Sequence, residues 1–184
     1  LPLIDAIDFR VIKEEQPRWL EFLSGNIDQI KIPKDNFDSV IENKTSIKPE
    51  FKAKGIYVSV EESLSYWFVI FNMKDELIGK NKKLRQALAA ALPAQEWLQI
   101  FKNGRGSVQT EVSPPAILDR CGKSYRWSYD LNKAKTLLSE AGYPDGKGLE
   151  TLKFDLRGAS ATERQLGEFI AKSYGKIGVN IEVI

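Results

Sequence analysis

The first forty residues carry short patterns of apolar and polar side chains. Residues 7–11 alternate strictly, which predicts a half-buried strand, and residues 27–32 predict a second one. Between them, Pro17 can occupy the first turn of a short helix that ends before Gly25. Residues 35–41 predict a further helix. The side chains expected to face inward from the first helix are Trp19, Leu20 and Leu23.

A polar segment and then two apolar segments follow along the chain. Residues 42–54 are polar and rich in lysine, so we expect a solvated connection there. Residues 55–60 and 64–72 predict two strands. The second is apolar at every position from 66 to 71, which is typical of a central strand buried on both faces of an α/β sheet.

The middle of the chain has the period of a helix. Apolar residues share one helical face over 82–92, Pro93 interrupts, and a second helix is predicted over 94–102. After a loop, Asp130 is expected to cap a helix that ends at Gly142.

The end of the chain predicts a strand, a helix and a strand, in that order. Residues 152–156 and 179–183 alternate between apolar and polar side chains. Between them, Thr162 and Gln165 are expected to form a capping box at the start of a helix. The whole order predicts a mixed α/β protein without an internal repeat.

Composition excludes several classes of function. The 184 residues have ordinary globular proportions, with 42% hydrophobic and 28% charged side chains and a formal net charge of +2. This balance gives no electrostatic footprint for nucleic acid. The chain has no histidine, so a catalytic triad or zinc site built on imidazole is excluded, and a single cysteine permits no internal disulfide. No cofactor or metal is expected, and no enzyme activity.

The apolar runs are too short to span a bilayer, and no signal peptide is visible. The chain opens at Leu1 without a methionine and stops inside an expected strand. We therefore expect both ends to be cut from a longer protein. The lack of a visible signal peptide then does not indicate the cellular compartment.

Three features could carry chemistry, but each has a simpler explanation. The glycine-rich residues 103–106 lack the lysine and serine of a P-loop, so a flexible connection is favoured. The acidic pair Glu14/Glu15, like similar pairs elsewhere, is expected to be solvated. Cys121 has no histidine to act as its base.

Aromatic residues could line a ligand site. Core packing explains Trp67 at least as well, because its strand is expected to be buried. Residues 125–129 are expected in a loop between helices, where exposed aromatic rings call for a further reason. Trp127 is therefore kept as a candidate ligand contact.

Arg157 is the charged residue of greatest interest. It ends the strand expected over 152–156 and precedes a small, polar loop. Ligands of α/β sheets collect at the carboxyl ends of strands, and a guanidinium there can hold a carboxylate through two hydrogen bonds. A salt bridge at the rim of the protein explains the residue equally well.

Short motifs along the whole chain resemble those of one protein family. They are the turn at 24–28, the strand end at 71–73, the RQAL helix at 84–91, the glycine loop and proline pair at 104–106 and 114–115, the YD…KAK…LL.EAGYP pattern at 129–144, and residues 164–166 and 177–181. In this order they resemble bacterial extracellular solute-binding proteins of family 5, the oligopeptide- and dipeptide-binding group. Residues 91–95 depart from the family's Ala-Ile-Asp-Arg, which puts the cap of the following helix in doubt.

The resemblance implies an α/β fold of the periplasmic-binding-protein type II kind, two-lobed, with mixed sheets and flanking helices, of which this chain is a fragment. Residues 1–66 would be the C-terminal part of the first lobe, and 67–184 most of the second, after a hinge crossover. The implied function is the solute-binding component of an ABC importer, which holds a peptide or similar solute in the cleft between lobes. Its partners would be the solute and the membrane permease subunits. Its place would be the periplasm or cell surface, with a signal peptide in the residues preceding Leu1.

The resemblance also implies candidate ligand contacts. Arg157 matches an arginine that faces the ligand's carboxylate in dipeptide-binding relatives. Ser65 and Tyr66 fall where relatives expose cleft residues at the crossover. An alternative function is the ligand-sensing domain of a transcription regulator with the same fold, which a helix-turn-helix outside these residues would indicate.

Overall fold

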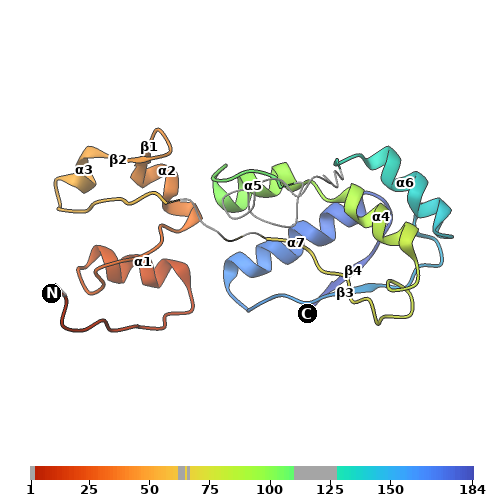
Figure 1. The fold of residues 1–184 in the computed structure, drawn as a ribbon, viewed down its shortest axis with the longest axis horizontal. Coiled ribbons are helices and arrows are strands. Elements are labelled where there is room, and N and C mark those ends of the chain that lie inside the picture. Colours follow the sequence, from red (N-terminus) through yellow and green to blue (C-terminus); the bar gives the residue numbers. More distant parts are fainter. Residues whose placement is uncertain (1–2, 62–64, 66, 110–127) are drawn as a thin grey trace.

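The computed structural model describes residues 3–61, 65, 67–109 and 128–184. Figure 1 shows two groups of elements, one before and one after the connection near residue 65. The first group contains α1 (Glu15–Leu23), the short 3-10 helix η1 (Lys34–Asn36), α2 (Phe37–Val40), β1 (Ile41–Glu42), β2 (Ser46–Ile47) and α3 (Pro49–Lys52). The second contains α4 (Lys82–Ala91), α5 (Ala94–Lys102), α6 (Leu131–Glu140), the 3-10 helix η2 (Pro144–Gly146), β3 (Leu152–Phe154), α7 (Ala161–Gly175) and β4 (Ile181–Val183).

A small apolar cluster holds the first group together. Its buried members, called the first core below, are Trp19, Phe37, Val40 and Ile41. Trp19 belongs to α1, and its ring stacks on that of Phe22 at 5.4 Å between centroids. The sequence placed Leu20 and Leu23 inward, which is wrong: both are exposed, and Phe22 packs on the core instead. The buried face of α1 thus follows Trp19 and Phe22, which are three residues apart and share a face.

Residues 35–54 are more structured than their sequence predicts. The helix expected over 35–41 is short, because the chain leaves it at Ile41 to form a hairpin in which β1 pairs antiparallel with β2. Asn43 and Lys44, both at positive φ, turn the hairpin. The expectation of a purely solvated connection is wrong, since Ile47 and Phe51 pack on the first core.

Several strands expected from alternating or apolar patterns are not formed. Residues 7–11, 27–32, 55–60 and the described part of 64–72 make no strand. Phe9 is 90% exposed and Ile70 is 75% exposed, so neither segment is buried as its pattern predicts. A strand forms only where another strand offers its backbone groups, and no described residue pairs with these segments.

The second group is built around α4, which packs against α6 and α7. Its buried residues, called the second core below, are Leu84, Ala87, Leu88, Ala90, Ala91, Ala134, Leu137, Leu138, Leu152, Ile170, Tyr174, Ile177 and Val179. Three of the four alanines of α4, Ala87, Ala90 and Ala91, are fully buried, because their small side chains let neighbouring elements approach closely. The helices predicted over 82–92 and 94–102 are confirmed as α4 and α5.

The helix starts follow the sequence in part. Asp130 caps α6 as expected, since its Oδ1 accepts a hydrogen bond from the backbone N–H of Lys133 at 2.9 Å. α5 follows Pro93 and has no side-chain cap, which agrees with the doubt raised by the departure from the family motif. The capping box expected at Thr162 is wrong, because Ser160 takes the cap position of α7 and accepts from the N–H of Glu163 at 3.2 Å. The hydroxyl of Thr162 is thereby left for another partner.

A parallel pair of strands closes the second group. β3 and β4 pair with Leu152 opposite Ile181 and Phe154 opposite Val183. Three further backbone hydrogen bonds extend the ladder, one of them from Leu156 N–H to the carbonyl of Ile184 at 2.9 Å. Parallel neighbours need a crossover, and α7 supplies it. α7 therefore starts just beyond the carboxyl end of β3, on the side that faces α1 in Figure 1.

The packing of α6 gives a test of the second core. Leu138 is fully buried. We expect Leu138→Ala to lower the free energy of unfolding by about 2–5 kcal/mol, because it removes apolar contacts and leaves a cavity. Leu20→Ala, at a site that is 61% exposed, is the matched control and should change it by less than about 1 kcal/mol. Urea denaturation followed by circular dichroism measures both, and equal losses would contradict this packing.

Candidate functional site

Lys102, the last residue of α5, lies over two indole rings. Its ammonium nitrogen is 3.9 Å from the ring centroid of Trp67 and 5.5 Å from that of Trp97. The preceding residue, Phe101, is buried and meets Phe169 of α7 edge to face at 5.6 Å. This contact fixes the end of α5 on α7, so that Lys102 reaches the segment that joins the two groups of elements. An ammonium over a tryptophan face is stabilised by the ring's electron density.

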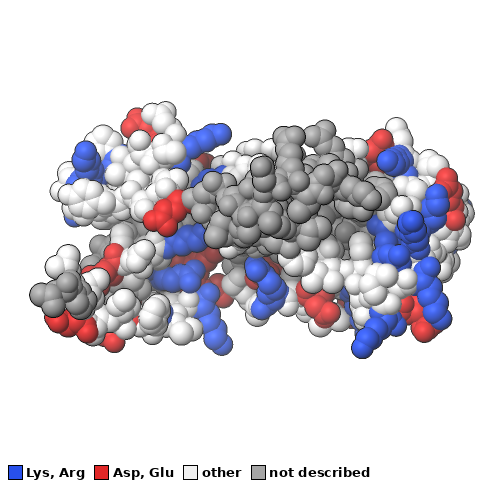
Figure 2. All heavy atoms as spheres, in the orientation of Figure 1, with Lys and Arg blue, Asp and Glu red and all other residues white. Residues whose placement is uncertain are grey.

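Other cations gather around Lys102. Lys31, from the first group, places its ammonium nitrogen 5.9 Å from the same Trp67 ring. The guanidinium carbon of Arg105 lies 4.1 Å from the ring centroid of Phe37 in the first core. Figure 2 shows Lys and Arg side chains gathered on this face around the place where the two groups meet. We call this place the junction.

The crowding of positive charge changes the acidity of Lys102. Burial, the largest cause, and the nearby cations Lys31, Arg105 and Arg157 together lower its pKa from 10.5 to about 8, against an opposite effect of Glu15. Among the described residues, no carboxylate lies within ion-pair distance of its ammonium group. An anionic group that entered the junction would therefore be attracted by several cations at once.

Arg157 lies at the junction, three residues beyond the end of β3. Its guanidinium donates to Oε1 of Glu163, in the first turn of α7, at 3.1 Å. The arginine side chain is 71% exposed and that of Glu163 only 17%. The guanidinium is therefore accessible to a carboxylate from another molecule, while Glu163 is the more buried end of the pair. Both alternatives raised by the sequence thus remain consistent with this geometry.

Two carboxylates of the first group reach the start of α7. Oε2 of Glu14 accepts from the backbone N–H of Ala161 at 3.3 Å, and Oε2 of Glu15 accepts from the hydroxyl of Thr162 at 3.2 Å. A cavity of about 300 Å³ lies between the two groups there. Its lining residues are Glu14, Glu15, Gln16, Pro17, Asp35, Ala161 and Thr162. The space between the two cores is therefore partly hollow.

A third contact across the junction comes from the end of α5. Asn103 ends this helix in a left-handed conformation, with φ of 50°, which asparagine tolerates better than most residues. Its side-chain amide donates to the backbone carbonyl of Lys34 at 2.9 Å. The turn after α5 is thus held to the first group by a specific hydrogen bond.

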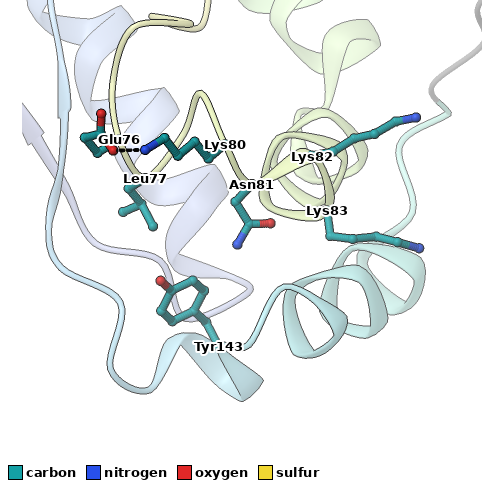
Figure 3. Close-up of a pocket in the computed structure, with 7 residues that line it drawn as sticks. All are labelled: Glu76, Leu77, Lys80, Asn81, Lys82, Lys83 and Tyr143. Atoms are coloured by element: carbon teal, nitrogen blue, oxygen red, sulfur yellow. Dashed lines mark hydrogen bonds and ion pairs between the residues drawn. The ribbon is translucent and has the colours of Figure 1, made fainter.

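A second hollow lies on the surface at the start of α4. It has a volume of about 420 Å³ and is lined by Glu76, Leu77, Lys80, Asn81, Lys82, Lys83 and Tyr143. Figure 3 shows Lys80 paired with Glu76, while Lys82 and Lys83 extend away from Leu77 and Tyr143. Asn81 caps α4 and also donates to the carbonyl of Ala141 at 2.9 Å. These polar groups already serve the fold, so we place the candidate site at the junction.

The candidates chosen from the sequence have different outcomes. The structure places Arg157 near Lys102 and Glu15, and Ser65 on the exposed connection two residues before Trp67. Tyr66 and Trp127 lie outside the described residues. Lys102 and Trp97 were not among the candidates predicted from the sequence. The pair Glu14/Glu15 was expected to be solvated. Its position just before the helix that starts near Pro17 could have indicated that these carboxylates bind N–H groups at the start of a helix.

Within the described ranges, no helix combines the length and the apolar character needed to cross a membrane. In the same ranges, no group of three or more cysteine, aspartate or glutamate side chains is arranged to hold a metal ion.

The chain belongs to the bacterial extracellular solute-binding proteins, family 5, whose family model matches residues 1–184. It is 27% identical over 180 residues to heme-binding protein A of Haemophilus influenzae, covering 96% of this chain and 30% of that protein. It is also 27% identical over 184 residues to the glutathione-binding protein GsiB of Shigella flexneri, covering 100% of this chain and 33% of that protein. The chain thus spans about a third of the length of these curated relatives.

The fold agrees with this membership. The structure resembles the periplasmic binding protein DppA of Helicobacter pylori in complex with the peptide STSA, with a TM-score of 0.70 and 23% identity. The match covers 95% of this chain and 31% of DppA. The expected fold class, α/β of the periplasmic-binding-protein type II kind, is confirmed, and this chain represents part of that fold.

The electrostatics of Lys102 can be tested directly. Arg157→Gln removes a cation that lowers the pKa of Lys102, so that pKa should rise, whereas Glu15→Gln removes an anion and should lower it below about 8. Carbon-13 NMR of the lysine side chain over a pH titration measures the change. Arg10→Gln, whose guanidinium faces Glu21 in the first group, is the control and should leave it unchanged. Shifts in the same direction for both junction variants would contradict the arrangement.

The lowered pKa of Lys102 also makes the free energy of unfolding depend on pH. In the unfolded chain Lys102 keeps its proton up to its ordinary pKa of 10.5, whereas in the folded protein it loses it near 8. The unfolded state binds more protons between these values, so the free energy of unfolding should rise with pH across this window through Lys102. Lys102→Met should flatten that rise in chemical denaturation at a series of pH values. An unchanged slope would contradict the lowered pKa.

Proposed function

We propose that this chain is part of the solute-binding component of an ABC importer, a receptor that binds a small solute outside the cytoplasm. It hands the solute to the membrane permease subunits without catalysing a reaction. The family match over residues 1–184 carries this proposal. It is supported by relatives named for binding heme and glutathione and by a structural neighbour in complex with a peptide. Within this range we favour a peptide or a similar small solute.

The proposed binding place is a cleft at the junction. Here residues 1–66 contribute to one lobe and 67–184 to the other. The separate first and second cores support this division, because in the part of the chain that the structure describes no buried residue belongs to both clusters. The hydrogen bonds that join residues 1–66 to residues 67–184 at the junction are made by polar groups. Polar interfaces between two parts of a chain favour movement of one part relative to the other. A solute held there would touch both parts.

A carboxylate is the group of the solute that the junction suits best. Arg157 carries an exposed guanidinium, and Lys102 adds a second cation near it. Ser65, Tyr66 and Trp127 remain proposed contacts on the solute's remaining surface. Among described residues, Trp67 and Trp97 offer ring faces beside these cations.

The alternative of a ligand-sensing domain in a transcription regulator has no support from the relatives. Those named above are binding proteins, and a receptor explains the same fold.

The role of Arg157 can be tested in the whole gene product. Arg157→Ala should weaken the binding of trialanine by about 1.5–3 kcal/mol, the scale of a hydrogen bond to a charged group. The same variant should weaken trialanine amide, which lacks the carboxylate, much less. Isothermal titration calorimetry measures both peptides. Lys153→Ala, an exposed cation on β3, is the matched control. Equal losses for the two peptides would contradict a carboxylate at Arg157.

A further inference from the structure

The side chain of Glu14 does not cap its own helix, α1, and instead makes a hydrogen bond to the start of α7. Glu14 holds the N-cap position of α1, yet its side chain makes no capping hydrogen bond there. Its carboxylate instead accepts from the N–H of Ala161, the first residue of α7, 147 residues further along the chain. The first N–H groups of a helix have no partner inside the helix and carry partial positive charge. A carboxylate from the first group thus takes a position that the internal cap of α7 leaves open.

Glu15 makes a matching contact beside it. Ser160 already accepts from the backbone of Glu163 and caps α7, so the hydroxyl of Thr162 is not needed by its own helix. This hydroxyl donates to Glu15. The two adjacent glutamates therefore accept hydrogen bonds from two adjacent residues of α7. We call these four residues, Glu14, Glu15, Ala161 and Thr162, the latch.

The surroundings of the latch are those of a contact that can open. Its hydrogen bonds are 3.3 and 3.2 Å long, and the one made by Glu14 is exposed to solvent. Beneath it lies the cavity of about 300 Å³ rather than a packed apolar layer. The first and second cores end on either side of it without a shared buried residue. Breaking the latch would expose polar groups that water can satisfy.

We propose that the latch holds the two groups of elements together when no solute is bound, and so sets how often the junction stands open. Asn103, by its hydrogen bond to Lys34, holds a second point of the junction and lets the parts separate at the latch alone. The latch acts between groups of this chain and does not depend on the identity of the solute. Its test is made without any solute, so it can fail while the proposed receptor function stands.

The test measures a distance across the junction. In the whole gene product, Cys121→Ser removes the one cysteine of this chain, and spin labels are attached at Lys52→Cys in α3 and Lys135→Cys in α6, both exposed. Pulsed electron paramagnetic resonance then gives the distribution of label distances. The unaltered latch should give one dominant distance, which belongs to the closed junction.

Two sets of variants break the latch from opposite sides. Glu14→Ala with Glu15→Ala removes the acceptors. Ala161→Pro with Thr162→Val removes the donors and spares α7, because proline is tolerated at the first position of a helix and Ser160 before it is already extended, with ψ of 160°. Each set should raise the ratio of the longer to the dominant distance roughly tenfold, the effect of losing two ordinary hydrogen bonds.

The control is Glu21→Ala in α1, whose carboxylate contacts Arg10 and Asn26 within the first group. It should leave the distribution unchanged. Circular dichroism confirms that α7 is intact in the proline variant. The proposal is overturned if both latch sets keep the original distribution, or if only the glutamate set changes it, since the glutamates would then act on a partner other than α7. It is also overturned if Glu21→Ala has the same effect.

Discussion

The parallel pairing of β3 with β4 is the constraint on which the junction depends. Parallel strands cannot be joined by a tight turn, so the chain must cross over, and here it does so through α7. The crossover begins at the carboxyl end of β3. Arg157 and the first turn of α7, whose N–H groups have no partner inside the helix, are therefore both delivered to one edge of the second group. The first group meets the second at this edge.

Charged side chains from both groups of elements gather at the junction. Lys102 and Arg157 bring positive charge from the second group, and Lys31 adds more from the first, while Glu14 and Glu15 bring negative charge to the start of α7. The rings of Trp67 and Trp97 hold the ammonium of Lys102 without neutralising it. Such a surface is poorly suited to permanent packing and well suited to enclosing a small charged solute.

The sequence predicted the helices of the second group because their hydrogen bonds and capping contacts are local. The apolar stripe of α4 and the carboxylate of Asp130 act within a few residues, so their patterns are sufficient. The alternation at residues 7–11 and the apolar run before Asn72 were misleading, because a strand also needs a partner that the pattern does not reveal. The family motifs supplied the fold class, which no local pattern could.

The site was predictable only where one residue stands at a marked position. Arg157 follows a strand and precedes a small, polar loop, and the structure puts it at the junction. Lys102 looks like an ordinary cation at the end of a helix, where it also favours the helix dipole. Its meeting with Trp67 depends on how Phe101 packs on α7 and on the course of the connection between the groups, both of which are long-range facts. The contacts of Glu14 and Glu15 span 147 residues and left only their position before α1 as a signal.

The most direct test of a solute site at the junction is a crystal structure of the whole gene product grown with trialanine. The account predicts electron density for the peptide between α1 and α7, in contact with both groups, with its carboxylate at hydrogen-bond distance from Arg157 or Lys102. Peptide bound to one group alone, for instance in the hollow beside Lys80 and Tyr143, would contradict it.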